Sequence, residues 1–472
     1  MSLEKPALCV DLDGTLLRTD VLYESLLALL AKNPLYFLLI PLWLLKGKAA
    51  LKRKLAQRVE LPPESLPYDE RVLQMLRTTS QRPRVLCTAS DELLVAPIAK
   101  HLGLFEEVMC SNGLRNLAGH RKADALVARF GEKGFDYLGN GFVDLDVWRR
   151  SASAVIVNGP ASLVKRAQGV VEVKEVLPPA TAGLRTWIKA LRIYQWMKNI
   201  LVLVPLFMAH RILDPGAAAQ ATIAFFAFGL CASGVYVLND LLDLTPDRLH
   251  PRKRNRPFAA GRIPILHGLL AAPLLTLGGL AIAFACSWQF AAVLVSYYAL
   301  TLSYSLKLKR IVMIDVILLA ALYTVRIIGG SVAIGAEMSF WLLAFSMFIF
   351  LSLALLKRFA ELESAKLDGK HTAIGRGYSV SDLSLIQSLG TSAGYIAVMV
   401  LALYINSPAS LELYQHPQML WLLCPVLLYW ISRVWMVAHR GHMHDDPIVF
   451  AVTDRASQIV GAVGVLVVVG AI

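Results

Sequence analysis

The sequence reads NDLLDLTPDRLHPRKRNRPFAAGRI at residues 239–263, between two long apolar runs. Its acids, Asp240, Asp243 and Asp247, are spaced by three and four residues, which predicts that they stack on one face of a helix. Neighbouring carboxylates repel one another unless a cation lies between them, and hard oxygen ligands suit Mg²⁺ carrying a diphosphate. Because the basic run from His250 to Arg256 follows directly, the pattern favours one loop that holds both metal and phosphate. The alternative is a solvated loop with the basic residues that are common beside membranes.

The apolar runs on either side predict a membrane domain. The chain has 472 residues, 56% of them hydrophobic, and its mean hydropathy of +0.55 is too high for a soluble protein of this size. A spanning helix needs about 20 mostly apolar residues. We therefore predict that residues 185–472 form an all-α polytopic domain with nine transmembrane helices, at 195–212, 217–238, 264–284, 287–304, 311–334, 339–356, 387–406, 418–438 and 448–472.

The distribution of basic residues predicts the orientation of these helices. With the N-terminus inside, the connections after the second, fourth and sixth spans carry fourteen Lys and Arg residues, against Arg211 alone on the outer side. Cytosolic loops are rich in Lys and Arg, so we expect a bacterial-type inner (cytoplasmic) membrane protein with its C-terminus outside. Residues 1–8 lack the pattern of a signal peptide, which places the N-terminal domain and the active sites in the cytosol.

The net charge and the spacing of the cysteines limit the kinds of site that the chain is expected to contain. The net charge of +13 has two explanations, the topology above and the attraction of phosphorylated substrates. The six cysteines include no CxxC pair, which favours buried hydrophobic side chains over disulfides or a zinc site.

The N-terminal part, residues 1–180, mixes charged and apolar residues as a soluble domain does. Residues 7–17 read ALCVDLDGTLL, which predicts a buried strand that delivers Asp11 and Asp13 into a tight turn. Two carboxylates in this position suit phosphoryl transfer. One attacks phosphorus or holds magnesium, and the other moves a proton.

This motif resembles that of the haloacid dehalogenase (HAD) phosphatase superfamily, and the likeness extends over most of residues 5–175. The resemblance implies an α/β, Rossmannoid fold with a small helical cap at about residues 18–80. It also implies the following roles: Asp11 as nucleophile, Asp13 as general acid/base, Thr88 (or Ser90) as the phosphate-binding hydroxyl, and Lys122 as the balance to phosphate charge.

One position departs from the HAD pattern. The superfamily usually has Gly-Asp where this chain has Gly139-Asn140, and Asp144 follows four residues on. A neutral amide is a weaker magnesium ligand than a carboxylate. Either catalysis is slowed, or Asp144 joins Asp11 and Asp13 as the metal ligand.

Within the predicted cap, the stretch 35–45 is very apolar but too short to span a membrane. It contains Pro41 and is followed by Lys46 and Lys48. We interpret it as a helical segment lying against the membrane or the second domain, with a buried core helix as the alternative. The boundary between the domains is predicted at Leu177-Pro178-Pro179-Ala180.

The motif NDxxDxxxD followed by KRNRPFAAGRI closely resembles the UbiA superfamily of intramembrane prenyltransferases, as do YQWMKN at 194–199 and YSLK at 304–307. The likeness covers about residues 185–472 and includes the number of spans. Aromatic-ring prenyltransferases of this superfamily carry a second acidic motif near the end of the sixth span. This chain has KRFAEL at 357–362 in its place.

Three segments together resemble the decaprenyl-phosphate phosphoribosyltransferase branch: KRxxEL at 357–362, GRGY at 375–378 and GHMHDDPIVFAVTDRAS at 441–457. That branch uses 5-phosphoribosyl 1-diphosphate, a polyprenyl phosphate lipid and Mg²⁺, and it binds no nucleic acid. A homo-oligomer is one option for its assembly. The resemblance implies that Asn239, Asp240, Asp243 and Asp247 hold Mg²⁺ and diphosphate, and that Lys198, Asn199, Arg254, Arg256, Lys357, Arg358, Glu361 and Tyr378 bind substrate.

Several other charged residues have two interpretations. Arg326 lies within a predicted span, where a charge is costly, so we expect it to face a cavity. Asp315 is either its partner or a helix-start residue. Asp445, Asp446 and Asp454 are either site residues or residues that cap helices or form local ion pairs.

The fusion of the two domains favours a bifunctional enzyme. The transferase product would carry a 5-phosphate on its ribose, and the HAD domain would remove it to leave a precursor for arabinofuranose donors in the cell envelope. Two alternatives are an aromatic prenyltransferase that uses a prenyl diphosphate, and a lipid-phosphate-binding scaffold with a degenerate HAD domain.

Overall fold

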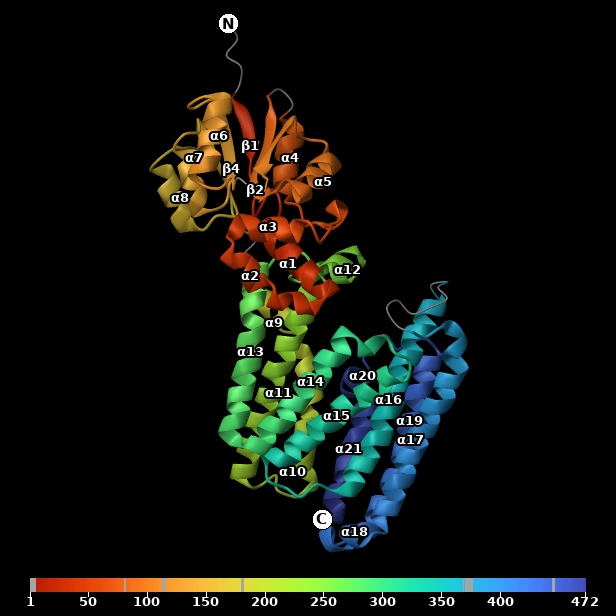
Figure 1. Ribbon diagram of the computed structural model, residues 1–472. Coiled ribbons are helices and arrows are strands. Elements are labelled where there is room, and N and C mark those ends of the chain that lie inside the picture. Colours follow the sequence, from red (N-terminus) through yellow and green to blue (C-terminus); the bar gives the residue numbers. More distant parts are fainter. Residues whose placement is uncertain are drawn as a thin grey trace. The chain divides into compact units, whose positions relative to one another are not determined.

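The structure is a computed structural model, and it describes residues 6–79, 82–112, 116–179, 182–367, 369, 377–443 and 446–472 (Figure 1). The chain forms two compact units. The first contains Met1–Leu191 together with Tyr236–Ala272, and the second contains Arg192–Val235 and Pro273–Ile472. The whole of the acidic and basic loop at 239–263, which we call the aspartate loop, therefore folds with the N-terminal domain rather than with the other helices.

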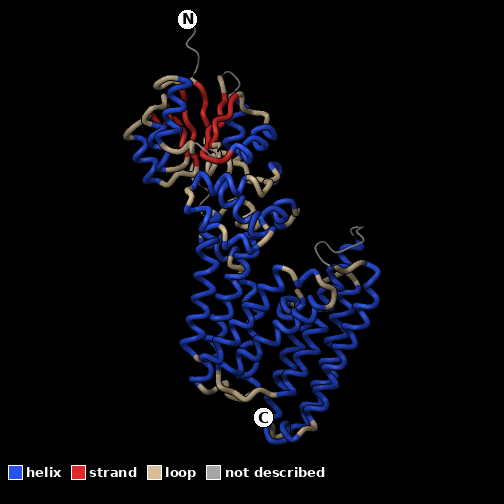
Figure 2. Tube along the Cα trace, in the orientation of Figure 1, coloured by secondary structure: helices blue, strands red, loops and turns tan. Residues whose placement is uncertain are grey.

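The N-terminal domain is built on one parallel six-stranded sheet, which confirms the predicted α/β class (Figure 2). Its strands are β1 (Ala7–Val10), β2 (Arg84–Asp91), β3 (Glu107–Ser111), β4 (Phe135–Gly139), β5 (Ser153–Val157) and β6 (Glu172–Leu177). The order is β3-β2-β1-β4-β5-β6, so β1 is central and the chain reverses its direction of travel across the sheet there. In such sheets, ligands bind beyond the carboxyl ends of the strands at this switch point.

A hydrophobic core covers each face of the sheet because the side chains of a strand alternate. Leu8 and Val10 of β1 face a core completed by α4 (Glu70–Thr78) and α5 (Glu92–Leu102). Ala7 and Cys9 face the opposite core, which contains residues of α6 (His120–Phe130), α7 (Leu145–Trp148) and α8 (Ala161–Gln168).

The predicted cap lies between β1 and β2. It comprises α1 (Val21–Lys32), η1 (Pro34–Leu38), α2 (Ile40–Leu45), α3 (Lys48–Ala56), η2 (Pro63–Ser65) and α4. Helix α4 packs against the sheet, so the part that projects beyond it ends before Glu70. The stretch 35–45 is not a buried core helix, because Leu35 is 71% exposed and Leu45 is 84% exposed.

The remaining elements are helical. They are α9 (Leu184–Ala190), η4 (Ile193–Leu203), α10 (Val204–Met208), α11 (Pro215–Leu242), α12 (Leu244–Leu249), η5 (Lys253–Asn255), α13 (Ile265–Cys286), α14 (Trp288–Leu306), η6 (Leu308–Arg310), α15 (Ile314–Ala333), α16 (Phe340–Leu367), η7 (Val380–Asp382), α17 (Leu383–Ile405), α18 (Pro408–Leu413), η8 (Pro417–Leu422), α19 (Leu423–His439), α20 (Pro447–Thr453) and α21 (Arg455–Ala471).

Among the described residues, six helical segments are long and apolar enough to cross a membrane, and the pair α20 and α21, bent by 78°, would make a seventh. The predicted span at 287–304 corresponds to α14, with 19 residues. The predicted span at 195–212 is divided between the 3₁₀ segment η4 and the short α10, where Pro205 occupies the first turn. The multi-pass helical class is therefore confirmed, and the count of nine stays a prediction.

Candidate functional sites

The first candidate site lies at the carboxyl end of the central strand β1. Asp11 follows this strand directly, and Gly14 turns the chain with a φ of +74° that favours glycine. A Cβ at Gly14 would lie 2.0 Å from Nδ2 of Asn140, so a larger residue there would force the Asn140 side chain to move. The amide of Asn140 therefore packs on the turn that carries Asp11 and Asp13.

Lys122 joins the residues around Asp11. Its Nζ donates to Oδ1 of Asp11 and to the hydroxyl of Tyr137, each at 2.8 Å, and lies 4.0 Å from Oδ1 of Asp144. Burial raises the pKa of Asp11 to about 7, and the charge of Lys122 limits that rise. Burial alone would lower the pKa of Lys122, but Asp11 and Asp144 outweigh it and the pKa of Lys122 is raised.

Asp13 is held by the cap and by β2. Its Oδ1 accepts from the backbone N–H of Val21 at 2.8 Å, and its Oδ2 accepts from Oγ of Ser90 at 2.7 Å. The hydroxyl of Thr88 lies farther away, at 3.5 Å from the same oxygen. Burial and then the nearby charge of Asp20 raise the pKa of Asp13 to about 6. Both hydroxyls considered from the sequence thus lie beside Asp13, with Ser90 the closer.

Asp144 is engaged within its own loop. Its Oδ2 accepts from the backbone N–H groups of Asn140 and Gly141, at 3.0 and 2.9 Å, and its Oδ1 accepts from Tyr137. This arrangement fits a residue that orients the Asn140 loop and Lys122. The role of Asp144 as a metal ligand stays a prediction.

The fit of this site to Mg²⁺ can be judged from its donors. In the part of the chain that the structure describes, no group of three or more His, Cys, Asp or Glu side chains is arranged to hold a metal ion. Asp11, which is buried, and Asp13, which is half-buried, nevertheless supply two hard oxygen donors whose ionisation is costly without a cation. Two carboxylates, with Asn140 beside them, are the set that would hold the ion.

Lys52 is a further candidate that sequence motifs did not reveal. It lies on α3 of the cap, and its Nζ donates to the backbone carbonyl of Ala89 at 2.7 Å. Its charge is among the influences that lower the pKa of Asp13. The cap carries no motif, so only the folding of α3 over the end of β2 brings this cation to the site.

The second candidate site is the aspartate loop. The prediction that Asp240, Asp243 and Asp247 stack on one helical face is wrong in one respect, because α11 ends at Leu242. Asp243 has a φ of −99° and a ψ of 18°, and it forms the N-cap position of the separate helix α12. Asp240 and Asp247 still come together across the break.

Arg256 supplies the cation that these carboxylates need. Its Nη1 lies 3.2 Å from Oδ1 of Asp240 and 2.6 Å from Oδ2 of Asp247, and both acids are buried. Positive charge between two buried carboxylates is what a divalent ion would also provide, so the donors fit Mg²⁺. Asn239 and Asp243 are half-buried, and Arg254 is exposed on η5.

The third candidate site is in the second unit and consists of Lys198, Lys357 and Asp446, which we call the lysine cluster. The Nζ atoms of both lysines lie 2.8 Å from the same oxygen of Asp446, Oδ2. Asp446 also caps α20 through the backbone N–H of Ile448. Two lysines on one carboxylate leave one positive charge in surplus, which suits a phosphate ligand.

Two buried polar side chains bind each other: Asn199, which follows Lys198 on η4, and Arg326 on α15. Arg326 donates to Oδ1 of Asn199 at 3.0 Å and to the hydroxyl of Tyr297 at 2.8 Å. The other amide atom, Nδ2 of Asn199, is buried and has no acceptor among the described residues. A buried donor without a partner is costly, and a bound ligand can satisfy it.

Asp315 lies in the first turn of α15, as the helix-start interpretation predicts, and it pairs with Arg358. The Nε of Arg358 lies 2.8 Å from Oδ2 of Asp315, and Arg358 also pairs with Glu361 and contacts the hydroxyl of Tyr304. Tyr378 donates to Asp315 at 2.6 Å and accepts from the backbone N–H of Met313. Arg358 and Tyr378 are thus held by protein partners in a buried network, whereas Lys357 remains partly exposed.

The structure distinguishes between the two interpretations for some of the three C-terminal acids, Asp445, Asp446 and Asp454, but not for all. Asp454 caps α21 and pairs with Arg433 at 2.8 Å, as the helix-cap interpretation predicts. Asp446 caps α20 and pairs with Lys198 and Lys357, and its role in a substrate site stays a prediction. Asp445 and residues 375–376 of the GRGY motif lie outside the described residues.

A family model, two relatives and one solved structure are similar to this chain or to parts of it. A model described as the UbiA prenyltransferase family matches residues 200–453. An uncharacterized protein, y4nM, of Sinorhizobium fredii is 40% identical over 97% of this chain and 89% of its own length. The decaprenyl-phosphate phosphoribosyltransferase of Mycolicibacterium smegmatis is 31% identical over 58% of this chain and 87% of its own length. A solved phosphoserine phosphatase is 14% identical, covers 37% of this chain and 93% of its own, and has a TM-score of 0.26.

Proposed function

Because the chain belongs to the UbiA prenyltransferase family, here joined to a HAD-like domain, we propose that it transfers phosphoribose from 5-phosphoribosyl 1-diphosphate to a polyprenyl phosphate. It is a multi-pass membrane protein, so a lipid acceptor can reach it from the bilayer. The similarity to a decaprenyl-phosphate phosphoribosyltransferase supports this choice of substrates. The HAD-like domain would then remove the 5-phosphate from the lipid product.

The lysine cluster is the observation that carries the proposal. A prenyl diphosphate enzyme of the aromatic type needs a second acidic motif, and this chain has Lys357 and Arg358 there. With Lys198, the surplus positive charge on Asp446 suits a phosphomonoester such as the lipid phosphate. The unsatisfied amide of Asn199 offers one more donor to such a ligand.

The proposed transfer is a substitution at C1 of the ribose. An oxygen of the lipid phosphate forms the new bond to C1, and the bond from C1 to the diphosphate oxygen breaks. Mg²⁺ would supply neutralising charge to the leaving diphosphate, with Asp240 and Asp247 as the residues that would hold it. Arg256 is placed to stabilise the same negative charge once it is released from the two acids. The lipid phosphate is already ionised, so no strong general base is required.

The proposed dephosphorylation uses the first candidate site. Asp11 attacks the phosphorus, and the ribose 5-oxygen leaves with a proton from Asp13. Water then cleaves the aspartyl phosphate, and Asp13 accepts its proton. Lys122 balances the charge of Asp11 and of the phosphoryl oxygens, and Mg²⁺ would add to that balance.

The test measures the release of diphosphate and of orthophosphate separately and identifies the lipid product by mass spectrometry. Full-length protein with Mg²⁺, polyprenyl phosphate and phosphoribosyl diphosphate should release both anions and form polyprenyl-phosphoribose. Asp11→Asn should release diphosphate alone and leave a lipid that keeps its 5-phosphate. If the unaltered protein releases no orthophosphate, the phosphatase half of the proposal is rejected.

A pair of lysine variants tests the observation itself. Lys357→Met should reduce transfer about 10- to 100-fold, because a charge-assisted contact to phosphate is lost. Lys366 is exposed on the same helix, so Lys366→Met should leave transfer unchanged. A labelled prenyl diphosphate and an aromatic acid should give no product. Product formation there would favour the aromatic prenyltransferase, and binding without turnover would favour the scaffold.

A further inference from the structure

The start of α1 is attached to the catalytic turn of the HAD-like domain. The first N–H of the helix, from Val21, donates to Asp13, and the N–H of Gly14 donates to the carbonyl of Thr19. Any displacement of this end of α1 would therefore disturb the turn that carries Asp13.

Within the first turn of α1, Glu24 binds Arg248 of the aspartate loop. Its two oxygens accept from Nη2 and Nη1 of Arg248 at 2.6 and 3.1 Å, and one of them also accepts from Oγ1 of Thr19 at 2.7 Å. The side chain of Glu24 is 3% exposed and that of Arg248 is 5% exposed. A two-pronged ion pair this deeply buried is specific in geometry, and the loss of either partner leaves an uncompensated charge.

Apolar packing surrounds this ion pair. Leu27, one turn further along α1, belongs to a buried cluster with Val237, Leu241, Leu244 and Phe258. The chain returns past the cap at Gly261, whose φ is +64°. A Cβ there would lie 2.8 Å from Cβ of Arg18, so the two segments are in direct contact.

Arg248 connects Glu24 of α1 to the acidic residues of the aspartate loop. It directly follows Asp247, and its Nε donates to the carbonyl oxygen of Ala259. This hydrogen bond joins two parts of the aspartate loop. Arg256 in turn joins Asp247 to Asp240. Asp247 is therefore followed in the chain by Arg248, which Glu24 holds, and is paired through its side chain with Arg256.

We infer that Glu24, a residue of the HAD-like domain, is a positioning residue for the diphosphate-binding aspartate loop of the transferase. This inference rests on the proposed function, in which Asp240 and Asp247 hold a magnesium diphosphate. Glu24 touches no substrate and acts through Arg248. The phosphatase turn and the diphosphate loop share α1 as a common support, which explains the fusion of the two domains at the level of side chains.

Binding of inorganic diphosphate with Mg²⁺ provides the test. Full-length protein in nanodiscs is titrated by calorimetry with diphosphate at fixed Mg²⁺, and the KM for phosphoribosyl diphosphate is measured in parallel. The variants are Glu24→Gln, Arg248→Gln and their double, with Glu60→Gln as a matched control on an exposed part of the cap.

Glu24→Gln should weaken diphosphate binding and raise KM about tenfold, with kcat reduced less, and Glu60→Gln should match the unaltered protein. The double variant should bind no more weakly than the weaker single variant, because the two residues act as one pair. Unchanged binding and KM in Glu24→Gln would overturn the inference, as would a loss of kcat that merely follows the folded fraction. If the unaltered protein binds no diphosphate, the proposed function fails and the inference fails with it.

Discussion

Lys122 is the residue on which the chemistry of the first site depends most. It is buried between Asp11 and Asp144 and has Tyr137 as its third partner. Lys122→Met would leave two buried carboxylates without a cation and remove a charge from the phosphoryl group. We expect phosphatase turnover to fall at least about 100-fold. Lys165→Met, an exposed lysine on α8, is the control and should keep full activity with p-nitrophenyl phosphate. Comparable rates for both variants would contradict this role.

The raised pKa values of Asp11 and Asp13 make metal binding depend on pH. Burial raises them to about 7 and about 6, above the ordinary value of 3.8. The metal-free folded state therefore holds more protons than the unfolded state between about pH 4 and pH 7, and its stability decreases as pH rises through that window. Mg²⁺ requires ionised ligands, so its affinity should increase with pH, by up to about tenfold per unit for each proton released.

Calorimetry of Mg²⁺ binding at pH 5.5 and pH 7.5 measures this linkage. The double variant Asp11→Asn, Asp13→Asn removes the first site, so any Mg²⁺ bound at the aspartate loop remains as the background. The difference between the two proteins should be large at pH 7.5 and small at pH 5.5. Equal differences at both values would show that these carboxylates are already ionised in the metal-free protein.

At the scale of elements, α17 and α19 approach closely at a glycine. A Cβ at Gly390 would lie 2.2 Å from Cζ2 of Trp435, whose indole N–H donates to Ser352 and cannot easily turn away. Gly390→Ala should lower the thermal unfolding midpoint. The cost of overpacking, about 1–3 kcal/mol, exceeds the gain of at most about 1 kcal/mol in helix propensity. Gly278→Ala on α13 meets no atom within 4 Å and should be neutral or stabilising.

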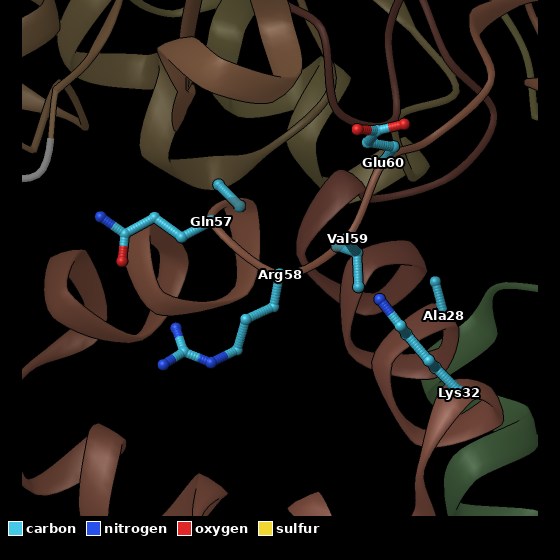
Figure 3. Close-up of a pocket in the computed structure, with 7 residues that line it drawn as sticks. Ala28, Lys32, Gln57, Arg58, Val59 and Glu60 are labelled. Carbon is cyan, nitrogen blue, oxygen red and sulfur yellow. The ribbon is translucent and has the colours of Figure 1, made fainter.

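The cap presents an apolar surface on η1 and α2. Tyr36, Ile40 and Trp43 pack inward, whereas other apolar side chains are exposed: Leu35, Phe37, Leu38, Leu42, Leu44 and Leu45. Nearby, Lys32 and Arg58 line a hollow of about 570 Å³ (Figure 3). An apolar surface with cations beside it suits an anionic bilayer, and the placement of this segment against the membrane or the second domain stays a prediction.

Photo-crosslinking tests the membrane contact. A benzoylphenylalanine placed at Leu45 in nanodiscs should form covalent adducts with lipid, which mass spectrometry detects. The same group at Glu70, an exposed residue at the start of α4, should form few. Adducts with protein instead of lipid at position 45 would show that another part of this chain, or a second copy, covers the surface.

At the scale of the whole molecule, the predicted topology can be tested with a native cysteine. Cys286 ends α13 and is exposed, whereas Cys9, Cys87, Cys231 and Cys424 are buried. With the N-terminus inside, residue 286 lies on the outer side of the membrane. A membrane-impermeant maleimide added to spheroplasts should therefore label the protein, and Cys286→Ser should abolish that labelling. Labelling that appears only after lysis would reverse the orientation.

Local patterns in the sequence predicted the elements and the chemistry well where neighbouring residues carry the signal. ALCVDLDGTLL contains a buried strand that ends at Val10, directly before Asp11, and its alternation matches the two cores of the sheet. The long apolar runs from residue 217 onward became long helices. Spacing failed at Asp243, since a helical period assumes one continuous helix and α11 ends at Leu242.

By itself, the sequence determined the α/β class and the membrane helices, and it predicted residues that hold phosphate and metal, because these depend on side-chain chemistry and short-range periodicity. Only the tertiary structure decided which charges are paired. Lys198 and Lys357 meet on Asp446, Asp315 binds Arg358 instead of Arg326, and Glu24 binds Arg248 across 224 positions. Such pairs form because a buried charge requires a partner. Which partner a charge meets depends on how distant helices pack. The spacing of residues along the chain does not reveal that packing.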